Sequence, residues 1–253
     1  MSIRWLPLVY AGFCYALFLA TFLYAIAFIG GFGVPRTLAG PVTEPWARAV
    51  AIDLVLLVAF ALQHSLMARP FVKRMLVRWV PASLERSTYV LASCVALAAI
   101  FVLWQPIGGE VWRIDTPWLR TAVWAGFGFG WLLVLVSTLL IDHFDLFGLR
   151  QAYCAARGRA CEPLPFATPS LYRMVRHPLY VGWLFAFWCA PTMTVGQLLF
   201  AVVTTCYILA AIRFEERDLI RAHPEYAAYR ERVPMLIPGL AAAKAKPVAS
   251  PTD

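Results

Sequence analysis

Histidines with polar neighbours interrupt or bound three apolar runs of this chain. His64 lies near the end of one run, and Asp142-His143 closes another. Arg176-His177 opens a third. Imidazole gains and loses a proton near neutral pH, so such a residue can act as a general base. Because ionisable groups inside a bilayer are costly, each of these residues is a functional candidate.

The segment around Pro178 gathers several chemically useful groups at the start of an apolar run. Proline suits the first turn of a helix, where its missing amide hydrogen costs nothing. Arg176 and His177 would lie at the positive end of that helix, and such an end with a guanidinium beside it binds an anion or carboxylate. Gly182 would let a neighbour or a ligand approach the backbone. A basic turn that anchors the chain at the membrane is the alternative.

Two adjacent acids, Glu215 and Glu216, follow the last apolar run. Carboxylates there can bind an ammonium group or ribose hydroxyls. A solvated helix face with offset charge pairs explains them equally well. Tyr226 and Tyr229 follow in a stretch that predicts a short helix folded beneath the bundle.

The composition indicates which elements must position these residues. Of the 253 residues, 61% are hydrophobic and 14% are charged, against about 25% charged in a soluble domain. We therefore expect an all-α integral membrane bundle of five to six transmembrane helices with a cytoplasmic C-terminal cap. The candidate spans are Leu6 to Ile29, Ala47 to Met67, Thr88 to Trp104, Thr121 to Ile141, Tyr180 to Met193 and Gly196 to Ile212. The last two are short and predict a helical hairpin.

In this topology most of the basic residues lie on one side of the membrane. All but four of the 22 Lys and Arg residues fall in segments expected in the cytoplasm, the exceptions being Arg36, Arg48, Arg113 and Arg120. This is the positive-inside pattern. It predicts a bacterial inner-membrane protein with both termini in the cytoplasm. It also accounts for the net charge of +8 without nucleic-acid binding.

Other parts of the sequence suggest no metal or redox centre. The six cysteines lack ligand spacing, and we expect them to be unpaired. Asp53 precedes His64 by about 16 Å of helix, which predicts a separate structural role. Residues 241–253 are rich in Ala, Lys and Pro and predict a disordered tail behind a single domain of residues 1–240.

Three blocks of the C-terminal half resemble the membrane methyltransferase superfamily that includes isoprenylcysteine carboxyl methyltransferases and phospholipid methyltransferases. They are Tyr172 to Gly182, Glu215-Glu216, and Tyr226 to Pro238. The resemblance implies that residues 1–240 form one transmembrane methyltransferase domain. It also implies that the C-terminal half forms a pocket for S-adenosylmethionine, closed by the segment after the last span.

For S-adenosylmethionine bound in such a pocket, we expect roles for several of these residues and for Arg217. Arg176 and Arg217 would bind the cofactor carboxylate, and the two glutamates its amine or hydroxyls. His177 and Tyr180 would contact its purine or ribose side. The full set of expected cofactor contacts is Arg176, His177, Tyr180, Gly182, Glu215, Glu216, Arg217 and Tyr229.

A closer resemblance covers most of the chain. The blocks Gln63 to Arg69 and His143 to Gln151 look like segments of methanethiol S-methyltransferases, which make dimethyl sulfide. The first block is also similar to NnrU-type proteins of nitrogen-oxide metabolism, so the second block favours the thiol methyltransferases. This resemblance implies a small thiol substrate, an S-adenosylmethionine cofactor and a place in sulfur metabolism.

The chemistry of thiol methylation assigns roles to the histidines. The thiolate is the useful nucleophile, and a histidine oriented by a carboxylate can accept the thiol proton. We expect His64 or His143 to be the base and Asp142 or Asp145 to orient it. An apolar thiol and its thioether product both enter lipid readily, which fits a site at the membrane.

Three alternatives belong to other substrate or protein classes. An isoprenylcysteine or lipid acceptor would need a docking surface, whereas large cytoplasmic loops are lacking. An NADPH-dependent membrane reductase shares a similar C-terminal block, but Glu215 and Glu216 would repel the 2′-phosphate. A non-catalytic NnrU-like protein or transporter is compatible with His64, although transporters commonly carry charges at the bilayer midplane.

Overall fold

The computed structural model describes residues 5–239 and shows five helices long and apolar enough to cross a membrane. They are α1 (Leu6–Gly30), α2 (Trp46–Met67), α4 (Glu85–Leu103), α5 (Pro117–Leu140) and α9 (Val195–Ala222). These helices confirm an all-α integral membrane protein. The tail expected at 241–253 lies outside the described residues.

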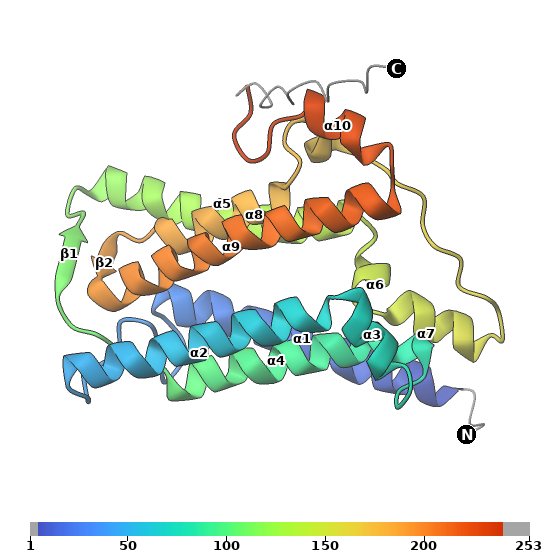
Figure 1. The fold of residues 1–253 in the computed structure, drawn as a ribbon. Coiled ribbons are helices and arrows are strands. Elements are labelled where there is room, and N and C mark those ends of the chain that lie inside the picture. The colour runs from blue at the N-terminus through green and yellow to red at the C-terminus, as the bar shows by residue number, and fades with distance from the viewer. Residues whose placement is uncertain (1–4, 240–253) are drawn as a thin grey trace, which may run out of the picture.

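The shorter elements gather at the two ends of the bundle (Figure 1). One end carries α3 (Pro70–Leu76), η2 (Ala82–Leu84), α6 (His143–Leu146), α7 (Leu149–Ala156), η3 (Ser170–Arg173) and α10 (Tyr226–Arg232). The other end carries β1 (Glu110–Arg113) and β2 (Thr192–Thr194), which pair antiparallel. We call the first end the α10 end. The start of α1 lies at this end too.

The long helices form two layers (Figure 1). Helices α1, α2 and α4 pack together, and α5 packs against α8 (Pro178–Trp188) and α8 against α9. Aromatic side chains fill the space between the layers: Phe28, Phe101 and Trp104 are buried there with Phe200 from α9. Contacts between α2 and α9 also join the layers.

Two glycines let α5 and α8 approach closely. A Cβ added at Gly182 would lie 2.7 Å from the carbonyl oxygen of Gly130, and one at Gly130 would lie 2.7 Å from that of Gly182. Small residues at such a crossing allow two backbones to meet within a membrane. The sequence predicted that either a neighbouring helix or a ligand approaches Gly182. In the structure the neighbour is α5.

The last two spans differ from the expected pair of short helices. Helix α8 ends at Trp188 and covers about 16 Å, roughly half of the hydrocarbon thickness. Helix α9 instead has 28 residues and continues ten residues past Ile212. A capping box between Thr194 and Gln197 fixes its start. Its charged C-terminal residues have high helix propensity, so the helix extends beyond the apolar run.

Two smaller expectations agree with the structure. All six cysteines are free. Asp53 is fully buried, and its Oδ1 accepts a hydrogen bond of 2.9 Å from the backbone N–H of Gln105, just beyond α4. This carboxylate therefore holds the chain where it leaves α4, which is a structural role.

Candidate active site

A buried cluster of three side chains joins the start of α8 to α9. Arg176 Nε donates to Glu216 Oε1 at 2.7 Å, and His177 Nε2 lies 3.0 Å from the same oxygen. The exposed fraction of each residue is below 10%. Glu216 thus compensates the charge of Arg176, which an isolated buried guanidinium could not tolerate.

Arg176 also fixes the end of α10 and the segment that follows it. Its Nη1 donates to the carbonyl oxygens of Arg230 and Val233, at 3.0 and 2.5 Å. The backbone N–H of Arg176 donates to the carbonyl of Pro234, and that of His177 to the carbonyl of Met235. The guanidinium expected to bind the cofactor carboxylate is therefore engaged with protein groups, and it braces the cap over the bundle.

Tyr229 belongs to the same cap. It is buried, and its hydroxyl donates to the backbone carbonyl of Tyr172. Burial raises the pKa of the Tyr229 phenol to about 12. The phenol is thus a neutral hydrogen-bond donor that ties α10 to η3.

Tyr180 and Glu215 form a second pair close to this cluster. The Tyr180 hydroxyl donates to Glu215 Oε2 at 2.9 Å, and the Glu215 side chain is exposed. Arg217 is exposed as well, and its guanidinium lies over the ring of Phe214, 6.0 Å from the centroid. Among the described residues Arg217 thus contacts Phe214, whereas Glu215 and Tyr180 face each other across α8 and α9.

His64 on α2 is held by two hydroxyl groups of α4. Its Nδ1 lies 3.1 Å from Ser93 Oγ, and its Nε2 lies 2.8 Å from the hydroxyl of Tyr89. The ring of Phe60 stacks on the imidazole with centroids 5.3 Å apart. The Tyr89 hydroxyl also lies 3.0 Å from Nδ1. Together these contacts hold the imidazole in place.

Tyr89, which hydrogen-bonds to His64, also lies within electrostatic range of the Tyr180–Glu215 pair. The phenols of Tyr89, Tyr180 and Tyr207 lie close enough to Glu215 and to one another for their charges to interact. We call these six residues the His64 site: His64, Tyr89, Ser93, Tyr180, Tyr207 and Glu215. Its members come from α2, α4, α8 and α9, so folding unites segments that are distant in sequence.

His143 lies in a different environment. Its Nε2 is 2.8 Å from the hydroxyl of Tyr15, and its Nδ1 is 2.9 Å from that of Thr138. The residue is buried, and burial lowers the pKa of the imidazole. Both ring nitrogens are therefore occupied, and the side chain links α1 to the end of α5.

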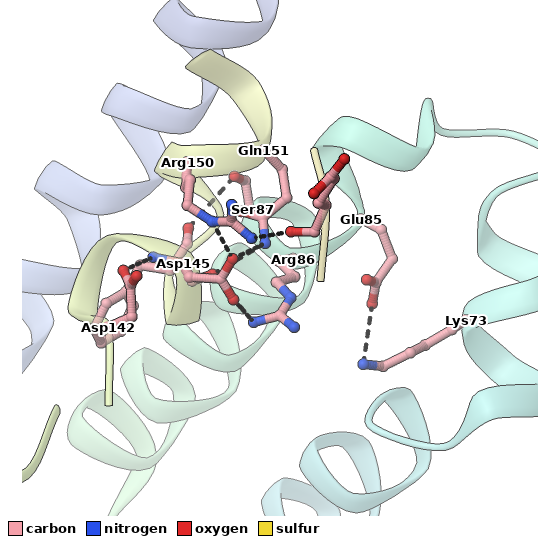
Figure 2. A network of polar contacts seen from close by, with 10 residues as sticks. Lys73, Glu85, Arg86, Ser87, Asp142, Asp145, Arg150 and Gln151 are labelled. Atoms are coloured by element: carbon pink, nitrogen blue, oxygen red, sulfur yellow. Dashed lines mark hydrogen bonds and ion pairs between the residues drawn. The ribbon is translucent and has the colours of Figure 1, made fainter. Parts of the chain in front are cut away.

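The two acids expected to orient a histidine instead organise their own loop (Figure 2). Asp145 accepts hydrogen bonds of 2.7 Å from Arg86 and from Arg150, and one of 3.0 Å from Gln151. Asp142 caps α6 by accepting from the backbone N–H of Asp145. In the described structure their carboxylates contact these groups and not an imidazole, so hydroxyls take the orienting position at both histidines.

Sequence reasoning missed Tyr89, Ser93 and Tyr207. A usable signal was present, because Tyr89 and Ser93 are four residues apart and so lie on one face of α4. Ser65, which follows His64, also hydrogen-bonds to Tyr207 at 3.1 Å. The polar residues of three apolar helices therefore point into one space.

Comparison with known proteins identifies the family. The chain is 49% identical to a methanethiol S-methyltransferase of a Pseudomonas strain over 232 residues, which cover 91% of this chain and 89% of the relative. It is 50% identical to one from Crocosphaera subtropica over 236 residues, or 93% and 92% of the two chains. The chain belongs to the methanethiol S-methyltransferase family. This confirms the resemblance seen in the blocks at Gln63 and His143.

The chain is also more distantly similar to Nurim proteins. The Nurim protein of Xenopus laevis is 30% identical over 197 residues, which cover 71% of this chain and 68% of Nurim. No protein-family model matches the chain, and no solved structure does.

Proposed function

We propose that the chain methylates methanethiol to dimethyl sulfide with S-adenosylmethionine as methyl donor, at the α10 end of the bundle. Relatives that match over nine-tenths of its length carry the name methanethiol S-methyltransferase. The observation that carries the proposal is that Tyr89, which hydrogen-bonds to His64, lies within electrostatic range of the hydrogen-bonded Tyr180–Glu215 pair. His64 as base and Glu215 as donor ligand would then belong to one site, which supports the proposal.

The donor set fits S-adenosylmethionine. Tyr180 occupies one oxygen of the exposed Glu215 carboxylate, and the other oxygen can accept from an ammonium group or a ribose hydroxyl. Arg230, whose side chain is 45% exposed at the rim of the Arg176–Glu216 pair, would receive the carboxylate. When bound, S-adenosylmethionine supplies an electrophilic methyl group on a positively charged sulfur.

The chain's own residues then prepare the thiol. A neutral imidazole at His64 accepts the thiol proton and so raises the fraction of nucleophilic thiolate. Because S-adenosylmethionine loses its positive charge in the reaction, alignment of the two sulfur atoms contributes more than additional charged groups. The apolar walls of α2, α4 and α9 suit a small thiol that enters from lipid.

Product formation tests this function. Purified protein in detergent or vesicles is incubated with methanethiol and methyl-labelled S-adenosylmethionine, and labelled dimethyl sulfide is measured in the headspace. We expect labelled product. Binding of NADPH without binding of S-adenosylmethionine would contradict the proposal and favour a reductase, and methylation of a prenylcysteine or lipid in place of methanethiol would contradict the substrate.

A further inference from the structure

A short amphipathic segment follows α2 where the second span ends. Helix α3 begins three residues after Met67, and hydrogen-bonded turns continue it to Val80. Because α2 contains 22 residues, it covers about 33 Å, close to the roughly 30 Å of a hydrocarbon core. The α3 segment therefore lies at the membrane–water boundary at the α10 end (Figure 1).

Large apolar side chains are exposed along one face of this segment. Phe71, Met75 and Trp79 follow one another at four-residue intervals and so project in nearly the same direction. Their exposed fractions are 51%, 55% and 89%. Tryptophan is typical of a membrane–water interface, because indole combines an apolar body with a polar N–H. This apolar stripe is thus suited to insertion among lipid chains close to the headgroups.

Two basic residues anchor the opposite side of the segment to the bundle. Arg69 pairs with Asp218 of α9 at 2.8 Å. Lys73 lies 3.8 Å from Glu85 at the start of α4 (Figure 2). Because Lys73 is two residues from Phe71, it projects from the other side of α3. These ion pairs therefore hold α3 in place and leave the apolar stripe uncovered.

Two further basic residues, Arg74 and Arg78, carry charge that the protein does not neutralise. Both are exposed, and their four-residue spacing places them in a row beside the apolar stripe. Neither forms an ion pair within residues 5–239. Residues 69–84 contain no Asp or Glu. A guanidinium group binds phosphate through two parallel hydrogen bonds, so this row is complementary to lipid headgroups.

We propose that the α3 surface, made of Phe71, Arg74, Met75, Arg78 and Trp79, binds anionic phospholipid. The apolar stripe inserts among acyl chains, and the guanidinium groups bind headgroup phosphates. A lipid with net negative charge is favoured, because a zwitterionic headgroup carries a positive charge close to the same phosphate. A second copy of the chain fits less well, since a symmetric contact would bring the arginines of both copies together.

Lipid selectivity tests the two arginines. The purified full chain in detergent is titrated with phosphatidylglycerol or phosphatidylcholine, and bound lipid is counted by native mass spectrometry. We expect the wild type to prefer phosphatidylglycerol. In Arg74→Gln/Arg78→Gln this preference should fall by about fivefold or more, since one basic residue near an anionic surface contributes about that factor. Arg157→Gln/Arg159→Gln removes two exposed arginines beyond α7 and should keep the wild-type preference.

Two results of this titration would overturn the proposal. One is an equal loss of preference in the two double variants, which would mean that any exposed pair of arginines attracts the lipid. The other is displacement of phosphatidylglycerol by inorganic phosphate but not by chloride at the same ionic strength. That result would show a site for a free anion and not for a lipid.

The position of Trp79 tests the apolar stripe independently. Wild type and Trp79→Phe are placed in phosphatidylcholine–phosphatidylglycerol vesicles, with and without bromine on the acyl chains near the headgroup. The difference between their emission spectra isolates Trp79, and we expect brominated lipid to quench it. Unquenched emission would refute insertion, and dimers that Trp79→Ser abolishes would assign the stripe to a second copy. Neither measurement depends on methyl transfer, so this inference and the proposed function can fail separately.

Discussion

Individual side chains at the α10 end divide into those that brace the fold and those that face a reaction space. Arg176 and His177 are buried and both contact the buried Glu216, whereas Glu215 is exposed and Tyr180 is only partly buried. In the sequence, members of both groups are neighbours: His177 lies near Tyr180, and Glu215 is next to Glu216. Only burial separates a charge that holds helices together from one that can meet a ligand.

Glu216→Gln should destabilise the protein because it leaves Arg176 as a buried charge without its partner. Loss of one member of a buried ion pair typically costs about 3 kcal/mol or more. The thermal midpoint in detergent should fall clearly. Glu231→Gln, an exposed glutamate of α10, is the control and should leave the midpoint nearly unchanged. Equal midpoints for the two variants would show that Glu216 does not brace the cap.

His143 should make stability depend on pH. Burial lowers its pKa in the folded protein, so the unfolded chain binds the proton first, at a pH near 6.5. Its contribution to stability is therefore complete above that pH and is lost as the pH falls below it. His143→Gln should weaken this loss in midpoints measured from pH 8 to pH 5, whereas His223→Gln, at a partly exposed residue, should keep it. A slope identical to wild type in His143→Gln would contradict the assignment.

At the scale of elements, apolar runs in the sequence predict the membrane helices, but they do not predict the cap. The first four spans were predicted within a few residues because a bilayer demands about 20 apolar residues for each helix. The extension of α9 carries charges, so hydropathy could not show where it ends. The β1–β2 pair has only three or four residues in each strand. Its pairing is set by the ends of α5 and α8 rather than by a local pattern.

The candidate site was predictable only in part for the same reason. Motif positions indicated His64, Tyr180 and Glu215; in the fold Tyr180 hydrogen-bonds to Glu215, and His64 to Tyr89. The partners Tyr89 and Tyr207 lie in apolar runs, where a tyrosine is as easily a packing residue as a functional one. Their role depends on the rotation of α4 and α9 about their axes, and pairwise helix packing determines that rotation.

Gly182→Ala should disturb the contact between α5 and α8. The new Cβ would lie 2.7 Å from the Gly130 carbonyl oxygen and 2.8 Å from the backbone N of Val134, so the helices must separate. Overpacking of this kind costs typically about 1 to 3 kcal/mol, and the thermal midpoint should fall. Gly128→Ala is the control, because its Cβ would meet no atom within 4 Å. Unchanged stability of Gly182→Ala would mean that the crossing tolerates a wider spacing.

At the scale of the whole molecule, chemistry and charge concentrate at one end of the bundle. The cap, the Arg176 brace and the His64 site all involve the α10 end, and the basic segments lie there too. In the proposed reaction the polar donor S-adenosylmethionine would come from water, and the apolar thiol from lipid. A site at a membrane–water boundary would give both molecules access, which would account for a small-molecule enzyme built into a bilayer.

The positive-inside pattern predicts that this end faces the cytoplasm, where S-adenosylmethionine would be available. Asp115→Cys, in an exposed loop after β1, should react in intact cells with a membrane-impermeant maleimide, in a background without native cysteines. Arg159→Cys, exposed beyond α7, should react only after the cells are opened. Both sites lie in water, so the difference reports sidedness rather than burial. The reverse labelling pattern would place the site outside and contradict the orientation from which the donor reaches it.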